Sequence, residues 1–360
     1  MKPGEPLSLL LAVVTSFLGA FLILPVLIRY TLLKNLVVEP GRRSIHKRKT
    51  PSLGGVAIFA GFLMASVCWL SKDESMVDRY ILGSLLIVFL LGVRDDLVPF
   101  SAWNKMLGQI AAIIVLLVSG IKINSLYGLF GVAQIPEMVG IPLTFLFILL
   151  VTNAYNLIDG LDGLAGTIGI ISYLAFGFWF HTVGQPVFAL LCFSMIGGLL
   201  AFLIFNWEPA EIFMGDSGAM VSGLMLGILG IHFMNINATL PLESPNKFNS
   251  TIGTAICFIV VPLCDTVRII ILRMSRGQSL FKADKNHLHH GLIRLGLTHS
   301  KATQVLGLVS AGFILLSFIL KSLGDLIVIP VVIVGCAALG LTIDFLLKKK
   351  VEGMGTQSER

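Results

Sequence analysis

Charged side chains are scarce in this sequence of 360 residues, because Asp, Glu, Lys and Arg together make up only 13% of it. Soluble globular domains carry about a quarter charged residues, so this scarcity excludes an ordinary soluble domain and a charge-rich disordered chain. The cysteines lie singly within apolar runs, at Cys68, Cys192, Cys257, Cys264 and Cys336. The absence of CxxC spacing and of a long linker excludes a disulfide scaffold and a two-domain chain.

Apolar residues, in contrast, make up 56% of the sequence, and the mean hydropathy is +0.91. A water-soluble fold of this length could not bury so much apolar surface, so the surrounding medium must be lipid. Apolar runs of spanning length recur along the chain. The sequence therefore predicts an all-α polytopic membrane protein with about eleven transmembrane helices, near residues 7–33, 53–71, 79–94, 104–121, 141–156, 164–181, 187–205, 217–236, 250–272, 302–320 and 325–347.

The distribution of basic residues predicts the orientation of these spans. Most of the 26 Lys and Arg residues fall on one side, and the positive-inside rule assigns that side to the cytoplasm. The N-terminus is then outside and the C-terminus cytoplasmic, so the net charge of +6 reflects topology and gives no indication of nucleic-acid binding. We expect one transmembrane domain over residues 1–350, a cytoplasmic tail at 351–360, and cytoplasmic loops near 34–52, 94–104, 156–163, 206–216 and 273–301.

An adjacent acid pair, Asp95 and Asp96, ends the third predicted span. Two neighbouring carboxylates repel each other unless a cation intervenes, and hard oxygen ligands suit Mg²⁺. The alternative is an ordinary solvated helix end, although negative charge is unfavourable at a helix C-terminus. The pair is therefore a candidate for binding a divalent metal or a lysine.

The segment 153–166 reads NAYNLIDGLDGLAG, in which Asn153, Asn156, Asp159 and Asp162 recur at a spacing of three. These side chains share one face if the segment is helical. A polar face directly after an apolar run is costly in lipid unless it lines an aqueous cleft. A glycine-rich turn with capping aspartates is the alternative interpretation.

Asp216 and Phe213 lie in the next cytoplasmic loop, in the sequence FMGDSG. Asp216 either caps the following helix or holds Mg²⁺ beside a phosphate. Phe213 is a candidate stacking surface for a nucleobase. The segment alone does not decide between these interpretations.

Two basic loops are candidates for binding phosphate groups. The loop 273–301 contains Arg273 and the sequence HLHH, with histidines at His287, His289 and His290. Without cysteines or an HExxH pattern these histidines make a weak zinc site, so charged hydrogen bonds to phosphate are the better interpretation. The loop 41–55 attracts anionic lipid headgroups, and its candidate residue is His46.

Together these motifs resemble one family. HKRKTPSLGG, GVRDDL followed by Lys105, NAYNLIDGLDGLAG, FMGDSG and PLCDTVRIIILRMSRGQSLFKADKNHLHH appear in the order seen in the polyprenyl-phosphate N-acetylhexosaminyl-1-phosphate transferases of glycosyltransferase family 4. The resemblance covers about residues 41 to 300. HLHH is similar to the branch that starts O-antigen, enterobacterial common antigen or teichoic acid linkage units.

The resemblance implies transfer of an N-acetylhexosamine-1-phosphate, with GlcNAc-1-phosphate expected, from a UDP-sugar to undecaprenyl phosphate. The products are undecaprenyl-diphospho-sugar and UMP, and the cofactor is Mg²⁺, with Mn²⁺ as an alternative. The setting implied is the bacterial cytoplasmic membrane, with a cytoplasmic active site and a homodimer as a family expectation. The alternatives are a phospho-MurNAc-pentapeptide transferase, a secondary transporter and an intramembrane aspartyl protease.

The resemblance also assigns roles to individual residues. Its catalytic positions match Asp95, Asp96, Lys105, Asp216, His289 and His290. Its substrate-binding positions match His46, Lys47, Asn156, Asp159, Asp162, Phe213, Arg273 and His287. Its metal ligands match Asp216, Asp95 and Asn156. Whether Asp95 and Asp96 act as base, as nucleophile or in positioning metal and phosphate is left open.

Overall fold

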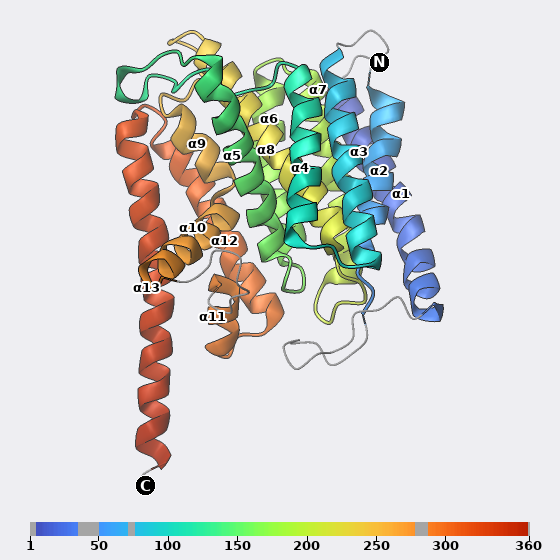
Figure 1. Cartoon of the computed structure of the whole chain (residues 1–360), viewed down its shortest axis with the longest axis vertical. Coiled ribbons are helices and arrows are strands. Elements are labelled where there is room, and N and C mark those ends of the chain that lie inside the picture. Colours follow the sequence, from blue (N-terminus) through green and yellow to red (C-terminus); the bar gives the residue numbers. More distant parts are fainter. Residues whose placement is uncertain (1–4, 35–49, 71–75, 278–286, 359–360) are drawn as a thin grey trace.

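The computed structural model describes residues 5–34, 50–70, 76–277 and 287–358, and within them it is an all-helical bundle without β-strands (Figure 1). Most helices run side by side in alternating directions. Their bounds are α1 Pro6–Leu33, α2 Gly54–Trp69, α3 Met76–Leu97, α4 Ala102–Val118, α5 Glu137–Ile158, α6 Leu164–Thr182, α7 Pro186–Asn206, α8 Gly215–Thr239, α9 Thr251–Phe258, α10 Val260–Ser275, α11 Leu288–Arg294, α12 His299–Ile319 and α13 Asp325–Ser358, with a short 3₁₀ turn, η1, at Leu129–Gly131.

The helices confirm a multi-pass membrane protein. In the described residues, seven of them (α1, α5, α6, α7, α8, α12 and α13) are long and apolar enough to cross a bilayer. The α9–α10 pair is an eighth candidate, and α2 and α4 are shorter apolar helices. Every predicted span falls on a helix or on this pair. The count of eleven spans and their orientation stay predictions.

One predicted span differs from the structure. The run 250–272 was expected to be a single helix, but it forms α9 and α10, which are bent by 94° at a break around Ile259. Pro262 lies in the first turn of α10 and has no N–H to donate back to the end of α9, so it removes a helical hydrogen bond at the break and favours a bend there. The structure also adds the short helix α11, and α13 extends beyond residue 347 to Ser358.

Helix α8 lies at the centre of the bundle and is almost entirely buried. It packs against α2, α3 and α5, and small residues let the backbones approach closely, as is usual between membrane helices. A Cβ atom on Gly55 would lie 2.0 Å from the backbone nitrogen of Gly218, and one on Gly92 would lie 2.4 Å from Cα of Ser217. These contacts hold the first turn of α8 between α2 and α3.

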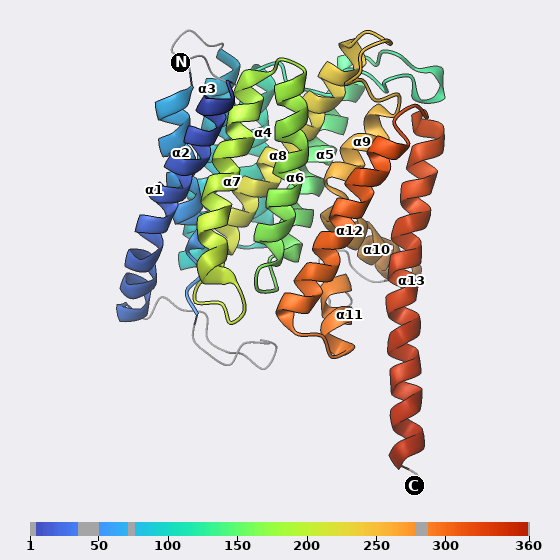
Figure 2. The same cartoon turned by 180° about the vertical axis from the view of Figure 1, so that it is seen from behind.

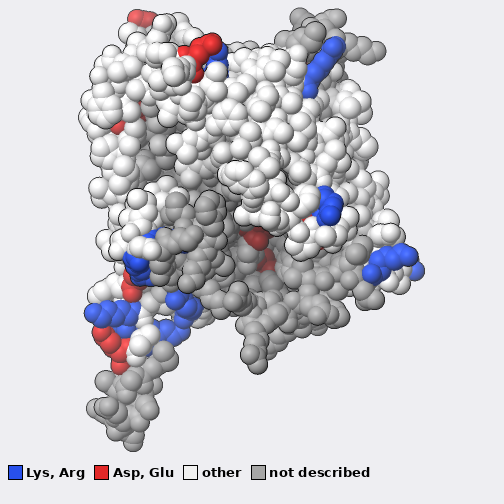
Figure 3. Space-filling model, viewed as in Figure 1, with Lys and Arg blue, Asp and Glu red and all other residues white. Residues whose placement is uncertain are grey.

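The two ends of the bundle differ. The described chain starts at one end, and α13 runs the length of the bundle and projects past the other (Figure 2). The face seen in Figure 3 is largely uncharged over its middle, and acidic side chains are visible in a hollow towards the end from which α13 projects. Helices α3 and α5 finish at this end, and α4, α6 and α8 begin there.

Candidate active site

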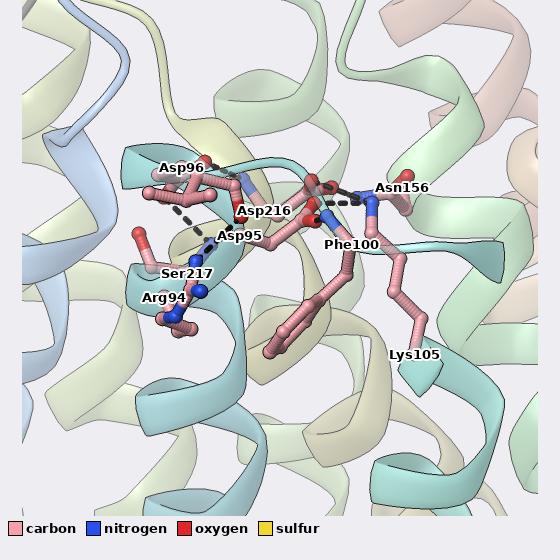
Figure 4. A network of polar contacts seen from close by, with 9 residues as sticks. Arg94, Asp95, Asp96, Phe100, Lys105, Asn156, Asp216 and Ser217 are labelled. Carbon is pink, nitrogen blue, oxygen red and sulfur yellow. Dashed lines mark hydrogen bonds and ion pairs between the residues drawn. The ribbon is translucent and has the colours of Figure 1, made fainter. Parts of the chain in front are cut away.

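Acidic, amide and basic side chains from four helices converge at this end of the bundle (Figure 4). Asp95 and Asp96 lie in the last turn of α3, and Asn156 lies in the last turn of α5. Lys105 and Asp216 lie in the first turns of α4 and α8. The sequence motifs that were expected on the cytoplasmic side of the membrane therefore lie close together in the structure.

Lys105 joins two of the carboxylates. Its ammonium nitrogen lies 2.5 Å from Oδ2 of Asp95 and 2.7 Å from Oδ2 of Asp216. Oδ1 of Asp95 also accepts a hydrogen bond from the backbone N–H of Phe100. Asp95 is buried, and Lys105 keeps 30% of its side chain exposed. The cation therefore lies between two helices with access to the surface.

Asp96, unlike Asp95, contacts the backbone at the start of α8. Its two oxygens accept hydrogen bonds from the backbone N–H groups of Asp216, at 2.7 Å, and Ser217, at 3.1 Å. It thus caps the N-terminus of α8 from another helix, where the free N–H groups and the helix dipole favour an anion. Gly215 makes this contact feasible, since its φ is +73° and an added Cβ would lie 2.7 Å from both Asp96 carboxylate oxygens.

The segment 153–166 is a helix end followed by a turn, so its polar residues do not share one helical face as the spacing of three suggested. Nδ2 of Asn156 donates a 2.5 Å hydrogen bond to Oδ1 of Asp216, whereas α5 ends at Ile158 and Asp159 is its C-cap residue. Although part of Asp159 remains exposed, burial of its carboxyl group raises its pKa well above the usual value, and the negative charges of Asp216 and Asp96 raise it further.

Asp162 is buried in a second set of contacts. Its Oδ2 accepts a 3.2 Å hydrogen bond from the N–H of Ala210 and lies 3.3 Å from Nδ1 of His299. The hydroxyl of Thr303 donates to its backbone carbonyl at 2.9 Å. Asp162 therefore links the turn after α5 to the loop after α7 and to α12. Its predicted contact with the nucleotide stays a prediction.

The histidines form a cluster at α11. The ring centroids of His289 and His290 lie 4.3 Å apart, and those of His287 and His289 lie 5.5 Å apart. Burial lowers the pKa of His289 to about 3, so this ring is neutral at physiological pH. A Cβ on Gly160 would lie 3.4 Å from Nε2 of His289, which places the cluster against the turn after α5.

Sequence reasoning assigned no role to the carboxylate that contacts these histidines, although it lies in the motif that ends in HLHH. Asp265 of α10 is 2% exposed, and its Oδ2 lies 2.9 Å from Nδ1 of His287. Its signal in the sequence is a single acidic residue within an apolar run. Asn206 was also missed: it accepts from the N–H of Gly163 and donates to the carbonyl of Ile212, which fixes the turn against the loop after α7.

Two of the remaining predicted residues, Phe213 and Arg273, lie within the described part of the chain. Phe213 is partly exposed, and its backbone is anchored at both ends, since its N–H donates to the carbonyl of Pro51 and its carbonyl accepts from Gly54. Arg273 lies partly buried in the last turn of α10. His46 and Lys47 lie outside the described residues.

The donor set fits a hard divalent cation. No three His, Cys, Asp or Glu side chains in the described ranges converge as a complete metal cage. Mg²⁺ does not require one, because it is usually held by one or two carboxylates, water and substrate phosphates. Asp95 and Asp216 supply two carboxylates that already reach a single ammonium. These two carboxylates can carry more negative charge than the single ammonium of Lys105 neutralises, which favours an additional cation.

Comparison of the sequence with known proteins places the chain in a family. The chain is 30% identical to a probable undecaprenyl-phosphate N-acetylglucosaminyl 1-phosphate transferase of Bacillus subtilis (strain 168), over 89% of this chain and 87% of that protein. It is 30% identical to a decaprenyl-phosphate N-acetylglucosaminephosphotransferase of Mycolicibacterium smegmatis, over 74% of this chain and 70% of that protein. It is 28% identical to an undecaprenyl-phosphate alpha-N-acetylglucosaminyl 1-phosphate transferase of Yersinia pestis, over 77% and 74%. Residues 79–234 match the family Glycosyl transferase family 4, and the chain belongs to that family.

Proposed function

We propose that the protein transfers GlcNAc-1-phosphate from UDP-GlcNAc to undecaprenyl phosphate, giving undecaprenyl-diphospho-GlcNAc and UMP. The observation that carries the proposal is the convergence of Asp95 and Asp216 on the ammonium of Lys105, in a chain whose relatives are named as transferases of this kind. Transfer between two phosphate-bearing substrates depends on charge neutralisation and in-line positioning. A site rich in carboxylates with one ammonium suits that task when a divalent cation joins it.

The proposed cofactor is Mg²⁺, with Mn²⁺ as a substitute, and when bound it neutralises charge on the diphosphate of the donor. Asp95 and Asp216 would hold it, and Asn156 orients Asp216 through its 2.5 Å hydrogen bond. Lys105 is placed to contact phosphate oxygens once they enter, because part of its side chain is exposed. Asp96 holds the first turn of α8 and so keeps Asp216 in position.

The reaction needs one bond to form and one to break. An oxygen of undecaprenyl phosphate attacks the sugar-bearing phosphorus of the donor, and the bond from that phosphorus to UMP breaks. A phosphate monoester has a second pKa near 6, so the nucleophile is largely ionised at neutral pH and needs little help from a base. We therefore favour direct attack, and trapping of a phosphosugar adduct on Asp95 or Asp96 would overturn this preference.

The nucleotide and the sugar phosphate are assigned to the surrounding residues. Phe213 would stack on uracil, with Asp159 or Asp162 recognising the uridine. Arg273 and the histidines His287, His289 and His290 would bind phosphate oxygens, as would His46 and Lys47. The histidine cluster supports this assignment because it lies against the turn that carries Asp159.

The proposed setting is the bacterial cytoplasmic membrane. The site lies at the end of the bundle that the basic loops assign to the cytoplasm, where UDP-sugars are available. The proposed role is the first membrane step in the synthesis of a cell-surface polysaccharide, and a homodimer is the proposed assembly. The apolar middle of the surface in Figure 3 suits this setting.

One assay tests the function. The purified protein is given radiolabelled UDP-GlcNAc, undecaprenyl phosphate and Mg²⁺, and label is measured in the lipid extract. Label is expected only with both substrates and the metal. Parallel reactions with UDP-GalNAc and UDP-MurNAc-pentapeptide identify the sugar, and preference for the pentapeptide donor would favour the peptidoglycan alternative. Absence of lipid-linked label with every donor would reject the transferase proposal and leave transport as the alternative.

A further inference from the structure

Asp265 connects α10 to the histidine cluster. Oδ1 accepts a 2.8 Å hydrogen bond from the backbone N–H of Leu288, and Oδ2 lies 2.9 Å from Nδ1 of His287. Both Asp265 and His287 are buried, with 2% and 5% of their surfaces exposed. One carboxylate therefore fixes both the backbone at the start of α11 and the ring of its N-cap residue.

This contact determines which nitrogen of His287 carries a hydrogen atom. An ionised carboxylate can only accept hydrogen bonds, so Nδ1 of His287 must be the donor. A hydrogen bond at one ring nitrogen sets the role of the other. In the neutral ring, Nε2 of His287 is thereby left as an acceptor.

The position of His287 constrains its two neighbours. The rings of His287 and His289 are nearly parallel, with 13° between their planes, and His290 lies against His289. Nδ1 of His289 is itself 3.9 Å from Oδ2 of Asp265. Nε2 of His289 approaches Gly160, the residue after Asp159. Contacts therefore lead from the Asp265 carboxylate through His287 and His289 to the turn that carries Asp159.

Asp265 lies in α10, the helix that follows the break at Ile259. Pro262 follows the break, and α10 leaves the direction of α9 by 94°. Figure 1 shows α10 crossing the bundle towards α13, above α11.

We propose that Asp265 is a positioning residue for the sugar-phosphate transfer, which selects the tautomer of His287 and holds the three histidines against the turn at Gly160. The role of Asp265 in the transfer reaction rests on the proposed function. Its structural part, the hydrogen on Nδ1 of His287, is independent of activity. The two parts can therefore fail separately.

The first experiment measures the wild-type protein by NMR with ¹⁵N-labelled histidine, and the His287→Asn variant assigns the His287 signals by their loss. A hydrogen on Nδ1 of His287 is expected. A ring that carries hydrogen on Nε2 alone would overturn the proposal, whatever the activity. If the tautomer is as expected and no lipid-linked sugar forms with any donor, the proposed function fails instead.

The second experiment compares Asp265→Asn with a matched control. The amide keeps the size of the carboxylate but presents an NH₂ group to one partner, which disfavours the tautomer with hydrogen on Nδ1. We expect kcat to fall about 10- to 100-fold, with little change in KM for the UDP-sugar and with altered His287 signals. The control is Asp325→Asn, because Asp325 is also buried and accepts from Ser250 and Gly253 but contacts no histidine in the described structure.

Asp325→Asn is expected to lower thermal stability without changing kcat of the folded protein. If Asp265→Asn behaves in the same way, with wild-type kcat and unchanged histidine signals, the residue has only a structural role and the proposal is wrong. Should Asp265→Asn fail to fold, the measurement on the wild-type protein still decides the tautomer.

Discussion

The ammonium nitrogen of Lys105 lies 2.7 Å from Oδ2 of Asp216, although the two residues are 111 positions apart in the sequence. The contact joins the first turn of α4 to the first turn of α8. Because the same nitrogen also reaches Asp95, one cation compensates two carboxylates from different helices. The site thus depends on cationic charge for its assembly as well as for its chemistry.

Replacement of Lys105 by Met tests this dependence. We expect kcat to fall about 10²-fold, because a donor to the developing phosphate charge is lost. The free energy of unfolding should also fall, by about 1–3 kcal/mol, because the buried carboxylate of Asp95 loses its cationic partner. Addition of Mg²⁺ should recover part of the lost unfolding temperature, because its charge would offset the repulsion between Asp95 and Asp216. Calorimetry with and without the metal measures this recovery.

The control for Lys105→Met is Lys122→Met. Lys122 pairs with Glu137 beyond the other end of α4, so its loss removes an ion pair without touching the site. Activity should stay at the wild-type level. Equal losses in the two variants would contradict a specific role for Lys105.

Asp216→Asn separates metal binding from helix capping. The backbone N–H of Asp216 would still donate to Asp96, so α8 should keep its N-terminus and the unfolding temperature should change little. Metal-dependent transfer should fall at least about 10²-fold, because a carboxylate ligand is lost. The measurement is lipid-extractable label against Mg²⁺ concentration, with Asp344→Asn at the surface ion pair with Arg268 as control. Near-wild-type turnover of Asp216→Asn would reject the assignment.

The raised pKa of Asp159 predicts a pH dependence of stability. The folded protein holds this proton at higher pH than the unfolded chain, because burial and then the charges of Asp216 and Asp96 disfavour the ionised form. Without metal, the contribution of Asp159 to stability therefore decreases as pH rises from the unfolded pKa, near 3.9, to the folded one. Mg²⁺ favours the ionised form, so it should stabilise the protein more at higher pH. Unfolding temperatures over this pH range, in EDTA and in Mg²⁺, measure the difference, and Asp159→Asn should remove it.

The helices were predictable because lipid imposes a simple rule. Each spanning segment must satisfy its backbone internally and present apolar side chains, so apolar runs mark the helices in the sequence. The break at Ile259 was not found, because apolar residues continue through it. Pro262 was the available signal, but its effect depends on whether neighbouring helices can accommodate a kink.

The sequence predicted which motifs form the site, but it did not predict the contacts between them. Asp95, Asn156 and Asp216 were expected on the same side of the membrane. In the structure Lys105 joins Asp95 to Asp216, and Asn156 donates a hydrogen bond to Asp216. The capping of α8 by Asp96 depends on close packing between helices that are far apart in the sequence. No local pattern encodes such a contact, since it requires the backbones to approach through small residues.

Gly215 provides a direct test of this close packing. Its φ is +73°, and an added Cβ would lie 1.9 Å from the backbone oxygen of Ser52 and 2.7 Å from the carboxylate oxygens of Asp96. Gly215→Ala should lower the free energy of unfolding by about 1–3 kcal/mol from overpacking, in addition to about 1 kcal/mol from the left-handed backbone. It should also abolish transfer, because the first turn of α8 carries Asp216.

Gly184→Ala separates the two contributions. Gly184 has nearly the same φ, +71°, but nothing lies within 4 Å of the added Cβ. This variant should therefore lose only about 1 kcal/mol and keep its activity, since Gly184 follows α6 at the opposite end of the bundle. Chemical unfolding of both variants, with the lipid-extraction assay beside it, makes the comparison. If the two alanines have the same effect, backbone strain alone explains Gly215, and the contact between the first turn of α8 and Asp96 does not hold Asp216 in place.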